Sequence, residues 1–253
     1  MVLYMIGLGL YDEKDITVRG LEAVKSSKLV YLEDYTSKLS VSIKKLEDYY
    51  GKKVISADRD MVEKNSDEIL NHAVKENVSF LVVGDVFSAT THVDIYLRAK
   101  EKGIQIEVIN NTSILTAIGL VGLELYKYGK TTSMPYFEPS FKPQTPYDVI
   151  KQNKKQGLHT LVLLDIKRDL DKYMSVNECL KQFLEIEEER KESVINNELM
   201  VVGCARLGSN NFKIKYGKVS ALLNEEFGDP LHCLIVPGKM HFMEEDMLTQ
   251  WKM

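Results

Sequence analysis

The sequence is poor in cysteine, in metal-ligand patterns and in long apolar runs, and each shortage excludes a class of protein. Its three cysteines, Cys179, Cys204 and Cys233, form no CxxC pair. This argues against a disulfide scaffold or a zinc site and favours a reducing, cytoplasmic compartment. The five histidines show no ligand spacing, so no metal site is predicted. The longest uncharged run, 108–123, contains asparagine, serine and threonine and is too polar for a membrane span.

The charge balance is slightly acidic. There are 33 Lys and Arg against 37 Asp and Glu, a net charge of −4, and no long basic block occurs. Such a chain is not expected to bind nucleic acid or an anionic membrane. Hydrophobic residues at 44% and charged residues at 28% are typical of a globular protein, and 253 residues suffice for one large domain or two small ones.

Apolar strands and amphipathic helices alternate over the first 110 residues. Continuous apolar runs predict strands buried on both faces at 2–8, 29–32, 54–57, 78–83 and 104–109. Helices are predicted between them: after the cap Thr17, over 41–50, after the cap Ser66, and from Thr90 or Thr91 to Lys102. This alternation predicts an N-terminal α/β domain, 1–112, with a mostly parallel sheet flanked by helices.

The character of the chain changes after Gly129. Four of the six prolines lie between 135 and 146, which favours a linker or an ordered surface loop. Beyond them, helices are predicted over 147–156, from the cap Ser175 to about 191, and over 243–251. Strands are predicted at 158–166, 199–205 and 231–236, with one or two more in 212–223. We therefore expect a C-terminal α/β domain with a mixed sheet, 136–253, joined to the first by a connecting helix and linker over 113–135.

Glycines follow the first strand, at Gly7 and Gly9. A dinucleotide-binding loop would use these glycines, with Glu33 at the end of the second strand as the ribose-binding acid. Asp12, however, stands where the third glycine belongs, and the acidic run 12–15 would repel a pyrophosphate. The pattern favours a tight turn beside some other ligand over an NAD or FAD site.

Two more strand ends carry polar residues. Gly84-Asp85 ends the most apolar strand, and Asp85 could accept a hydrogen bond from a ligand or merely bond its own turn. His92, in the first turn of the next helix, is expected to be a packed or capping residue because no catalytic partners are visible. The segment 110–114 again joins a strand to a helix through small polar residues. Three such ends, at 9–10, 85–88 and 112–114, should converge on one rim of the sheet, which predicts a ligand site.

These segments also resemble a known family, the diphthine synthases (diphthine methyl ester synthases in their eukaryotic form). The resemblance covers nearly the whole chain and is carried by the first 24 residues and by LVYLEDYTS, VVGDVFSATTH, INNTSILTAIG, HTLVLLDIK, YMSVNE and DPLHCLIVPGKMHFMEEDML. The family belongs to the tetrapyrrole-methylase-like, class III methyltransferases. The resemblance implies two α/β domains, a homodimer, and S-adenosylmethionine bound between the domains.

The resemblance also implies site residues. Carried over position by position, the cofactor contacts of the family fall on Leu10, Asp85, Ser88, Ser113 and Ile114 in the first domain and on Leu164, Leu207 and His232 in the second. The family usually has proline at the position of Val86, and its absence should make that loop less rigid. An in-line displacement from a donor that carries its own leaving group chiefly requires the protein to hold the reactants in line. The substrate ammonium must lose a proton before it attacks, and the sequence identifies no base for that step.

The implied substrate is translation elongation factor 2 whose target histidine carries a 3-amino-3-carboxypropyl group. Trimethylation of the amine is expected, and the YMSVNE and MHFMEEDML stretches favour the eukaryotic product, with an additional methyl ester. Three alternatives stay open at this point. They are a tetrapyrrole (uroporphyrinogen or precorrin) methyltransferase of the same fold, a non-catalytic S-adenosylmethionine-binding scaffold, and a dinucleotide oxidoreductase.

Overall fold

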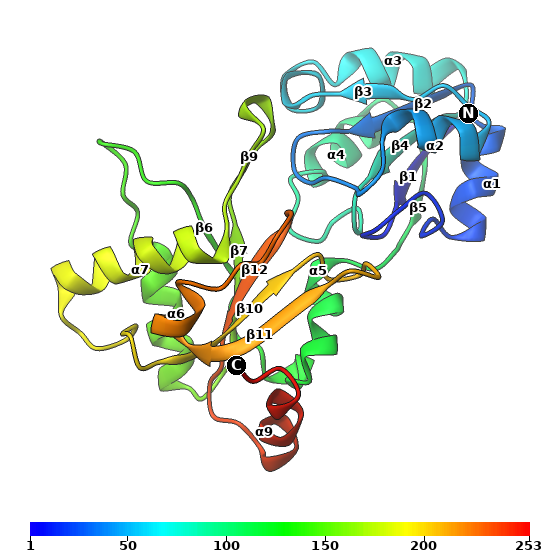
Figure 1. The fold of residues 1–253 in the computed structure, drawn as a ribbon. Coiled ribbons are helices and arrows are strands. Elements are labelled where there is room, and N and C mark those ends of the chain that lie inside the picture. Colours follow the sequence, from blue (N-terminus) through cyan, green and yellow to red (C-terminus); the bar gives the residue numbers. More distant parts are fainter. The chain divides into compact units, whose positions relative to one another are not determined.

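The computed structural model describes all 253 residues, and the chain folds as two compact units, Met1–Ala117 and Ile118–Met253 (Figure 1). The segment expected to connect the domains, 113–135, is divided between them. Residues 113–117 pack with the first unit, and 118–135 pack with the second. No helix in the structure is long and apolar enough to cross a membrane.

The first unit is a parallel five-stranded sheet in the order β3-β2-β4-β1-β5 (Figure 1). Its strands are β1 (Val2–Gly7), β2 (Leu29–Glu33), β3 (Ile55–Ala57), β4 (Val78–Val82) and β5 (Gln105–Ile109). Every residue of the central strand β4 is buried, as its continuous apolar run predicts. The sheet carries one apolar cluster on each face, so the prediction of an α/β unit with a parallel sheet is confirmed.

Helices cover both faces of this sheet. They are α1 (Val18–Ser26), α2 (Ile43–Tyr50), α3 (Asp67–Lys75) and α4 (Val93–Glu101). Residues of α1 and α2 belong to one cluster and residues of α3 and α4 to the other. The side chain of Thr17 accepts a hydrogen bond from the Gly20 amide, which confirms the predicted cap of α1.

Two predicted helix starts in this unit are wrong. Ser66 precedes α3 but makes no capping hydrogen bond, and its hydroxyl is buried without a partner. The chain reaches it through a short π-helix, η1 (Asp60–Lys64), which the hydrophobic pattern does not reveal. Helix α4 begins at Val93 rather than at Thr90 or Thr91. The reason is that Ala89 adopts a left-handed φ of 61° and the Thr90 hydroxyl bonds back to the Val86 carbonyl.

The second unit is a mixed sheet in the order β11-β10-β12-β7-β6, which confirms the predicted mixed sheet. Its strands are β6 (Thr132–Met134), β7 (Thr160–Leu164), β10 (Met200–Ala205), β11 (Lys213–Lys218) and β12 (His232–Val236). Only β6 and β7 pair in parallel; the other neighbours are antiparallel. A small hairpin, β8 (Ile166–Lys167) and β9 (Lys172–Tyr173), follows β7. The helices are α5 (Ile114–Ala117), at the end of the first unit, and α6 (Thr145–Lys155), α7 (Val176–Arg190), α8 (Val219–Leu222) and α9 (Phe242–Thr249), in the second.

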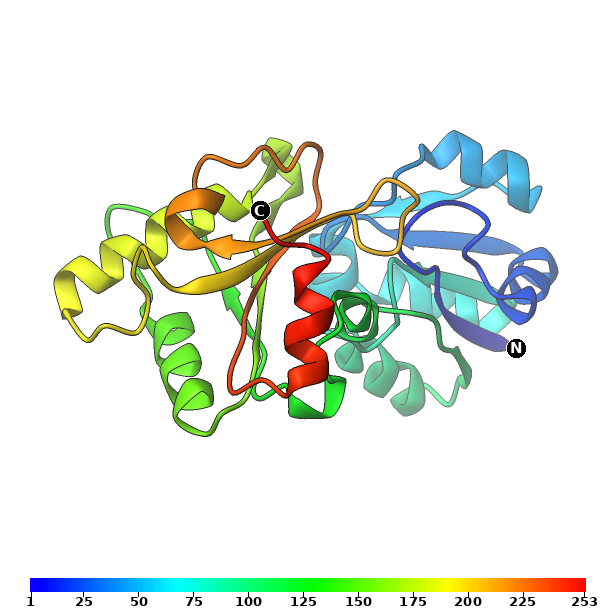
Figure 2. The same ribbon diagram turned by 60° about the horizontal axis from the view of Figure 1, so that its bottom comes forward.

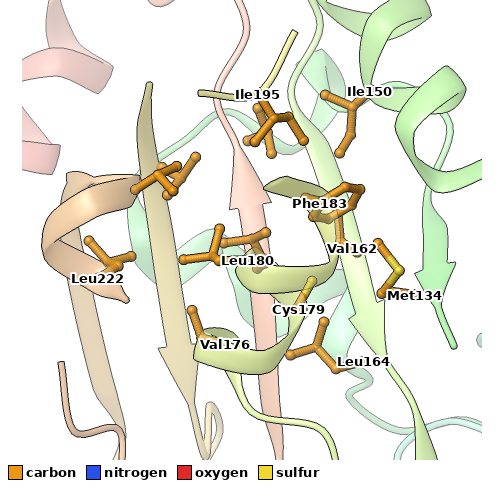
Figure 3. Close-up of a cluster of buried hydrophobic side chains, with 14 of the residues drawn as sticks. Met134, Ile150, Val162, Leu164, Val176, Cys179, Leu180, Phe183, Ile195 and Leu222 are labelled. Carbon is orange, nitrogen blue, oxygen red and sulfur yellow. The ribbon is translucent and has the colours of Figure 1, made fainter. Parts of the chain in front are cut away.

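The core of the second unit lies between α7 and its sheet (Figure 3). Val176, Cys179, Leu180 and Phe183 recur at helical spacing and are fully buried, so one face of α7 covers the strands. Ser175 and Glu178 form a reciprocal capping box that starts this helix as predicted.

Two segments of the second unit differ from the prediction. Thr132–Met134, inside the segment expected to connect the domains, forms the edge strand β6, because its partner β7 supplies hydrogen bonds that the sequence does not show. The segment 212–223 holds one strand and then the short helix α8, in which Val219 and Leu222 are buried at helical spacing.

A buried carboxylate joins three segments of the second unit. Glu244, near the start of α9, is 1% exposed and accepts from the amides of Glu124 and His241, from His159 and from the Lys127 ammonium. Figure 2 shows α9, drawn in red, beside a green segment of the chain. Because Glu244 is buried and accepts from four donors, its hydrogen bonds should contribute strongly to the stability of this unit.

Candidate functional site

Three strand ends of the first unit meet where the sequence predicts a rim. A Cβ built on Gly7 would lie 2.6 Å from the Gly84 carbonyl oxygen and 2.9 Å from Asn111 Cβ, so only glycine allows this approach. Gly9 and Gly84 exchange backbone hydrogen bonds of 3.2 and 2.7 Å. The carboxyl ends of β1, β4 and β5 are therefore in direct contact, as a ligand site at the rim of a parallel sheet requires.

The structure argues against a dinucleotide at this rim. Oδ2 of Asp15 accepts from the amides of Leu10 and Tyr11, at 3.1 and 2.8 Å, and so occupies donors that a pyrophosphate would need. Glu33 is 1% exposed and accepts from the amides of Tyr35 and Thr36 and from the Thr36 hydroxyl. The carboxylate that would bind a ribose is thus buried and already satisfied.

Asp85 links the second strand end to the third. Its Oδ1 accepts from the Phe87 amide and the Ser88 hydroxyl within its own turn. Its Oδ2 accepts from the Asn110 side chain and the Asn111 amide, each at 3.0 Å. Partial burial raises the pKa of Asp85, but these hydrogen bonds outweigh it and lower the pKa, so the group is a carboxylate at neutral pH. Asp85 is a turn residue and a bridge between loops at once.

The predicted first-unit residues gather around Gly84. The position of a Cβ on Gly84 lies 3.8 Å from the Leu10 side chain and 3.9 Å from Ser113 Cβ. Ser88 joins them through its bond to Asp85, and Ile114 follows Ser113 at the start of α5. The Ser113 hydroxyl accepts from the Leu115 amide, as a helix cap does.

Asn111 is the residue of this rim whose role sequence reasoning missed. Its side-chain amide donates to the Gly7 and Asp15 carbonyls, both at 3.0 Å, and so ties the third strand end to the first. The motif around it signalled a helix start but gave no sign of these two distant acceptors.

The predicted second-unit residues lie on the side of the mixed sheet where β7 and β10 end and β12 begins; this side is called the edge below. Ala205 pairs with His232, and Leu163 pairs with Cys233, so the ends of β10 and β7 flank the start of β12. Leu164 follows Leu163 directly, Leu207 lies two residues after Ala205, and both are buried. The edge brings together all three residues carried over for this unit.

Arg206 holds the loops of this edge together, and nothing in the sequence singled it out. It has a left-handed φ of 52°, and its guanidinium donates to the Asn211 carbonyl at 3.1 Å, to the Phe227 carbonyl at 2.9 Å and to the Asp229 carbonyl. A planar fork with several donors suits such a set of backbone acceptors. The Arg206 side chain therefore joins the turn after β10 to the turn before β12, beside the backbone hydrogen bond from the Arg206 amide to the Leu231 carbonyl.

His232 presents an unused acceptor at the same edge. Its Nε2 lies 3.1 Å from the Gly228 carbonyl and 3.0 Å from the Asp229 carbonyl, so Nε2 carries the proton. Nδ1 is buried and has no partner. Burial lowers the pKa of His232, which keeps the ring neutral and its Nδ1 lone pair available to a donor.

No acid–base dyad or metal cluster accompanies these residues. No group of three His, Cys, Asp or Glu side chains lies close enough to hold a metal ion. His92 is 1% exposed and precedes α4, so it is the packed residue that the sequence suggests rather than an exposed base. Each of the two sets of residues offers backbone groups and hydrogen-bond acceptors, which can orient a ligand.

The comparisons with known proteins agree with one another on the family of this chain. Residues 2–223 match the family model of the tetrapyrrole (corrin/porphyrin) methylases. The diphthine methyl ester synthase of Dictyostelium discoideum is 47% identical over 269 residues, which cover 100% of this chain and 98% of that protein. The diphthine synthase of Methanococcus maripaludis strain C7 is 48% identical over 248 residues, which cover 98% and 97%.

A solved structure supports the same relationship. The crystal structure of a putative diphthine synthase from Entamoeba histolytica matches with a TM-score of 0.93 at 48% identity, over 100% of this chain and 98% of that one. A fold match of this quality at this identity extends the likeness from the motifs to every element of the chain.

Proposed function

Since this chain belongs to the tetrapyrrole methylase family, among the diphthine synthases, we propose that it methylates the modified histidine of elongation factor 2 with S-adenosylmethionine as donor. The chain is a methyltransferase of diphthamide biosynthesis. Methylation of a free tetrapyrrole is not favoured, because relatives that match the chain from end to end are named for diphthine. The convergence of three strand ends at Gly7, Gly84 and Asn111 is the observation that carries the proposal for the donor site.

The residues present fit an adenosyl sulfonium donor. The unpaired, buried Nδ1 of His232 is an acceptor of the kind that the exocyclic amine of adenine needs. Leu164 and Leu207, both buried at the same edge, offer apolar surface to a flat base. In the first unit, Leu10, Ser113 and Ile114 line the rim, and Asp85 and Ser88 order the loop beside them. We propose that these eight residues hold the donor.

The mechanism needs little chemistry from side chains. When bound, the donor supplies a methyl group on a sulfonium that is itself the leaving group. The protein's part is to hold the nucleophile, the methyl carbon and the sulfur in line, which can contribute about 7–11 kcal/mol through orientation alone. The rim of the first unit does this with a braced backbone, since Asp85, Asn111 and Gly84 each bridge two strand ends.

The acceptor is an amine on a protein side chain. We propose three methylations of this amine and methyl esterification of the neighbouring carboxylate, because the eukaryotic relatives are named diphthine methyl ester synthases. We also propose that the chain works as a homodimer in the cytoplasm. Its three buried free cysteines are consistent with a reducing compartment.

Three measurements test the proposal. Calorimetry with S-adenosylhomocysteine should show one site per chain, and the absence of binding at high micromolar ligand would favour a scaffold without a methyl donor. Mass spectrometry of elongation factor 2 carrying the 3-amino-3-carboxypropyl group, after incubation with this protein and labelled donor, should show a gain of four methyl groups. A gain of three would limit the chain to the amine, and no gain would refute the proposed substrate. Sedimentation at micromolar concentration tests the dimer.

A further inference from the structure

His92 lies buried at the point where the loop after β4 enters α4. Its side chain is fully buried, and the residue is 1% exposed. The loop in front of it, residues 85–91, contains Asp85 and Ser88, two of the proposed donor contacts. A buried imidazole beside such a loop raises the question of what it does there.

One ring nitrogen of His92 is bonded to that loop. Nδ1 lies 3.1 Å from the Val86 carbonyl oxygen. A carbonyl can only accept, so Nδ1 carries a proton and donates. The Thr90 hydroxyl donates to the same oxygen at 2.7 Å. Two donors from the end of the loop therefore hold the carbonyl at its beginning.

These hydrogen bonds stabilise a loop whose backbone conformation is unfavourable for its residues. Ala89 has φ of 61°, a left-handed conformation that is costly for a residue with a Cβ. The second residue of the loop is Val86, which, unlike a proline, does not fix φ. The Val86 side chain is fully buried in the first-unit core. The loop is therefore held by a packed side chain and by the two donors to its carbonyl.

The other ring nitrogen of His92 makes no hydrogen bond. Nε2 is buried without a partner and lies 3.8 Å from Glu33 Oε2, beyond hydrogen-bond reach. Glu33 already accepts from Tyr35 and Thr36. The rings of Phe80 and Tyr35 meet the imidazole edge to face, with centroids 5.4 and 6.4 Å away. The aromatic neighbours thus fix the orientation of the imidazole, and Nδ1 is the ring nitrogen that makes a hydrogen bond.

We propose that His92 is a positioning residue for methyl-donor binding, and that its Nδ1–H holds the Val86 carbonyl so that the 85–91 loop presents Asp85 and Ser88 to the donor. This inference rests on the proposed function, since it takes the loop to be part of the donor site. The Nδ1 proton is present in the neutral ring and in the imidazolium, so the role does not depend on the charge of His92.

If His92 only filled space, its replacements would behave differently, and two variants distinguish the positioning role from the packing role. In His92→Asn, the side-chain amide reaches the place of Nδ1 and can still donate to Val86. In His92→Gln, the longer side chain brings its amide to the place of Nε2, which makes no bond in the native protein. If packing alone mattered, the longer glutamine would be the better replacement. His72→Asn on the exposed face of α3 is the matched control.

The test is calorimetric titration of the full-length protein and these variants with S-adenosylhomocysteine, beside urea unfolding. We expect His92→Asn to bind within about threefold of the native protein and His92→Gln to bind about tenfold more weakly, the loss typical of one buried hydrogen bond. We expect the two variants to differ little in stability. Equal affinities, or weaker binding by the asparagine variant, would overturn the inference.

Two ligand-free measurements keep the inference separate from the proposed function. Amide exchange across residues 85–91 should be faster in His92→Gln than in His92→Asn, and equal exchange would refute the positioning role even if the native protein bound no donor. The ¹⁵N spectrum of the native imidazole should show a protonated Nδ1. This spectrum tests the positioning role even if neither variant folds, because a proton on Nε2 alone would refute that role. Failure of the native protein to bind, with the exchange difference present, would instead sink the proposed function.

Discussion

Removal of the Glu244 carboxylate should destabilise the second unit more than any surface change of the same size. Glu244 is 1% exposed, and each of its oxygens receives two donors. Oε1 accepts from the Glu124 amide and from His159 Nε2, each at 2.9 Å, and Oε2 accepts from the His241 amide at 2.7 Å and from Lys127. His159 cannot turn away, because its Nδ1 accepts from the Gly238 amide at 2.9 Å. Of the four donors, only Lys127 has a second acidic partner, Glu124, at 3.7 Å.

The magnitude follows from this count of donors. Glu244→Ala takes the acceptor from the buried His159 N–H and from the partly buried amides of Glu124 and His241, and it leaves Lys127 only its longer contact to Glu124, at 3.7 Å. Removal of one partner of a buried ion pair costs about 3–5 kcal/mol. The Lys127 side chain keeps 23% exposure, so its charge is partly hydrated and we expect the lower part of that range. Glu244→Gln should also lose stability, because each oxygen of the carboxylate accepts from two donors, so the NH₂ of glutamine faces two donors in either orientation. We expect this variant to cost about 2–3 kcal/mol.

Urea unfolding followed by tryptophan fluorescence is the assay. Trp251, the single tryptophan, lies at the end of α9 and donates to the Val121 carbonyl at 3.0 Å, so its signal reports on the unit that contains Glu244. Glu245→Gln, at the exposed neighbouring position, is the control and should change stability by less than about 0.5 kcal/mol. Loss of less than about 0.5 kcal/mol in Glu244→Gln would refute the reasoning.

The pH dependence gives an independent check. Burial raises the pKa of Glu244, but the hydrogen bonds from Lys127, the Glu124 and His241 amides and His159 outweigh it and lower the pKa from an ordinary 4.5 to about 2. Because the folded pKa lies below the unfolded one, this stabilisation is complete above about pH 4.5 and is lost as the pH falls towards 2. The difference in the free energy of unfolding between the native protein and Glu244→Gln should therefore become smaller as the pH falls over that range. A gap that stays constant would show that ionisation of Glu244 contributes nothing.

The remaining predictions concern both units. Asp85→Ala should weaken binding of S-adenosylhomocysteine at least about tenfold in calorimetry, while unfolding by urea loses only about 1 kcal/mol, because water can replace several of its partly exposed bonds; native affinity would show that Asp85 serves only its turn. Gly203→Ala should cost about 1–3 kcal/mol in the same unfolding assay, since its Cβ would lie 2.3 Å from the Phe227 ring, and an unchanged midpoint would mean that the ring moves aside freely. Phe183→Ala should cost about 3–5 kcal/mol, as it empties the fully buried centre of the second core, and a loss below about 1 kcal/mol would contradict this packing.

Strong local patterns made most of the fold predictable. Buried parallel strands need continuous apolar runs, and every run in the first 110 residues became a strand. The caps Thr17 and Ser175 were predictable because the capped amides lie within three residues. Ser66 failed as a cap since the π-helix before it gives it a helical backbone, from which its hydroxyl does not reach the amides. The edge strand β6 was missed because its pairing depends on β7, far along the chain.

At the rim of the first sheet, too, some features were predictable from the sequence and others were not. The types of residue at the three strand ends, Gly7, Asp85 and Asn111, follow from the sequence, and so does their convergence once a parallel sheet is assumed. Their partners do not. Asn111 donates to the Gly7 carbonyl 104 residues away, and this depends on the order of strands in the sheet.

By itself, then, the sequence determined where strands and helices form, which strand ends carry polar residues and to which family the chain belongs. Those features depend on local periodicity and on motif order, both of which can be read along the chain. Only the tertiary structure decided that His92 acts on Val86 through Nδ1, that Arg206 braces the loop before β12, and that Glu244 collects four donors. Each of these roles depends on which distant groups the folded backbone brings within hydrogen-bond reach, and burial decides how much each bond is worth.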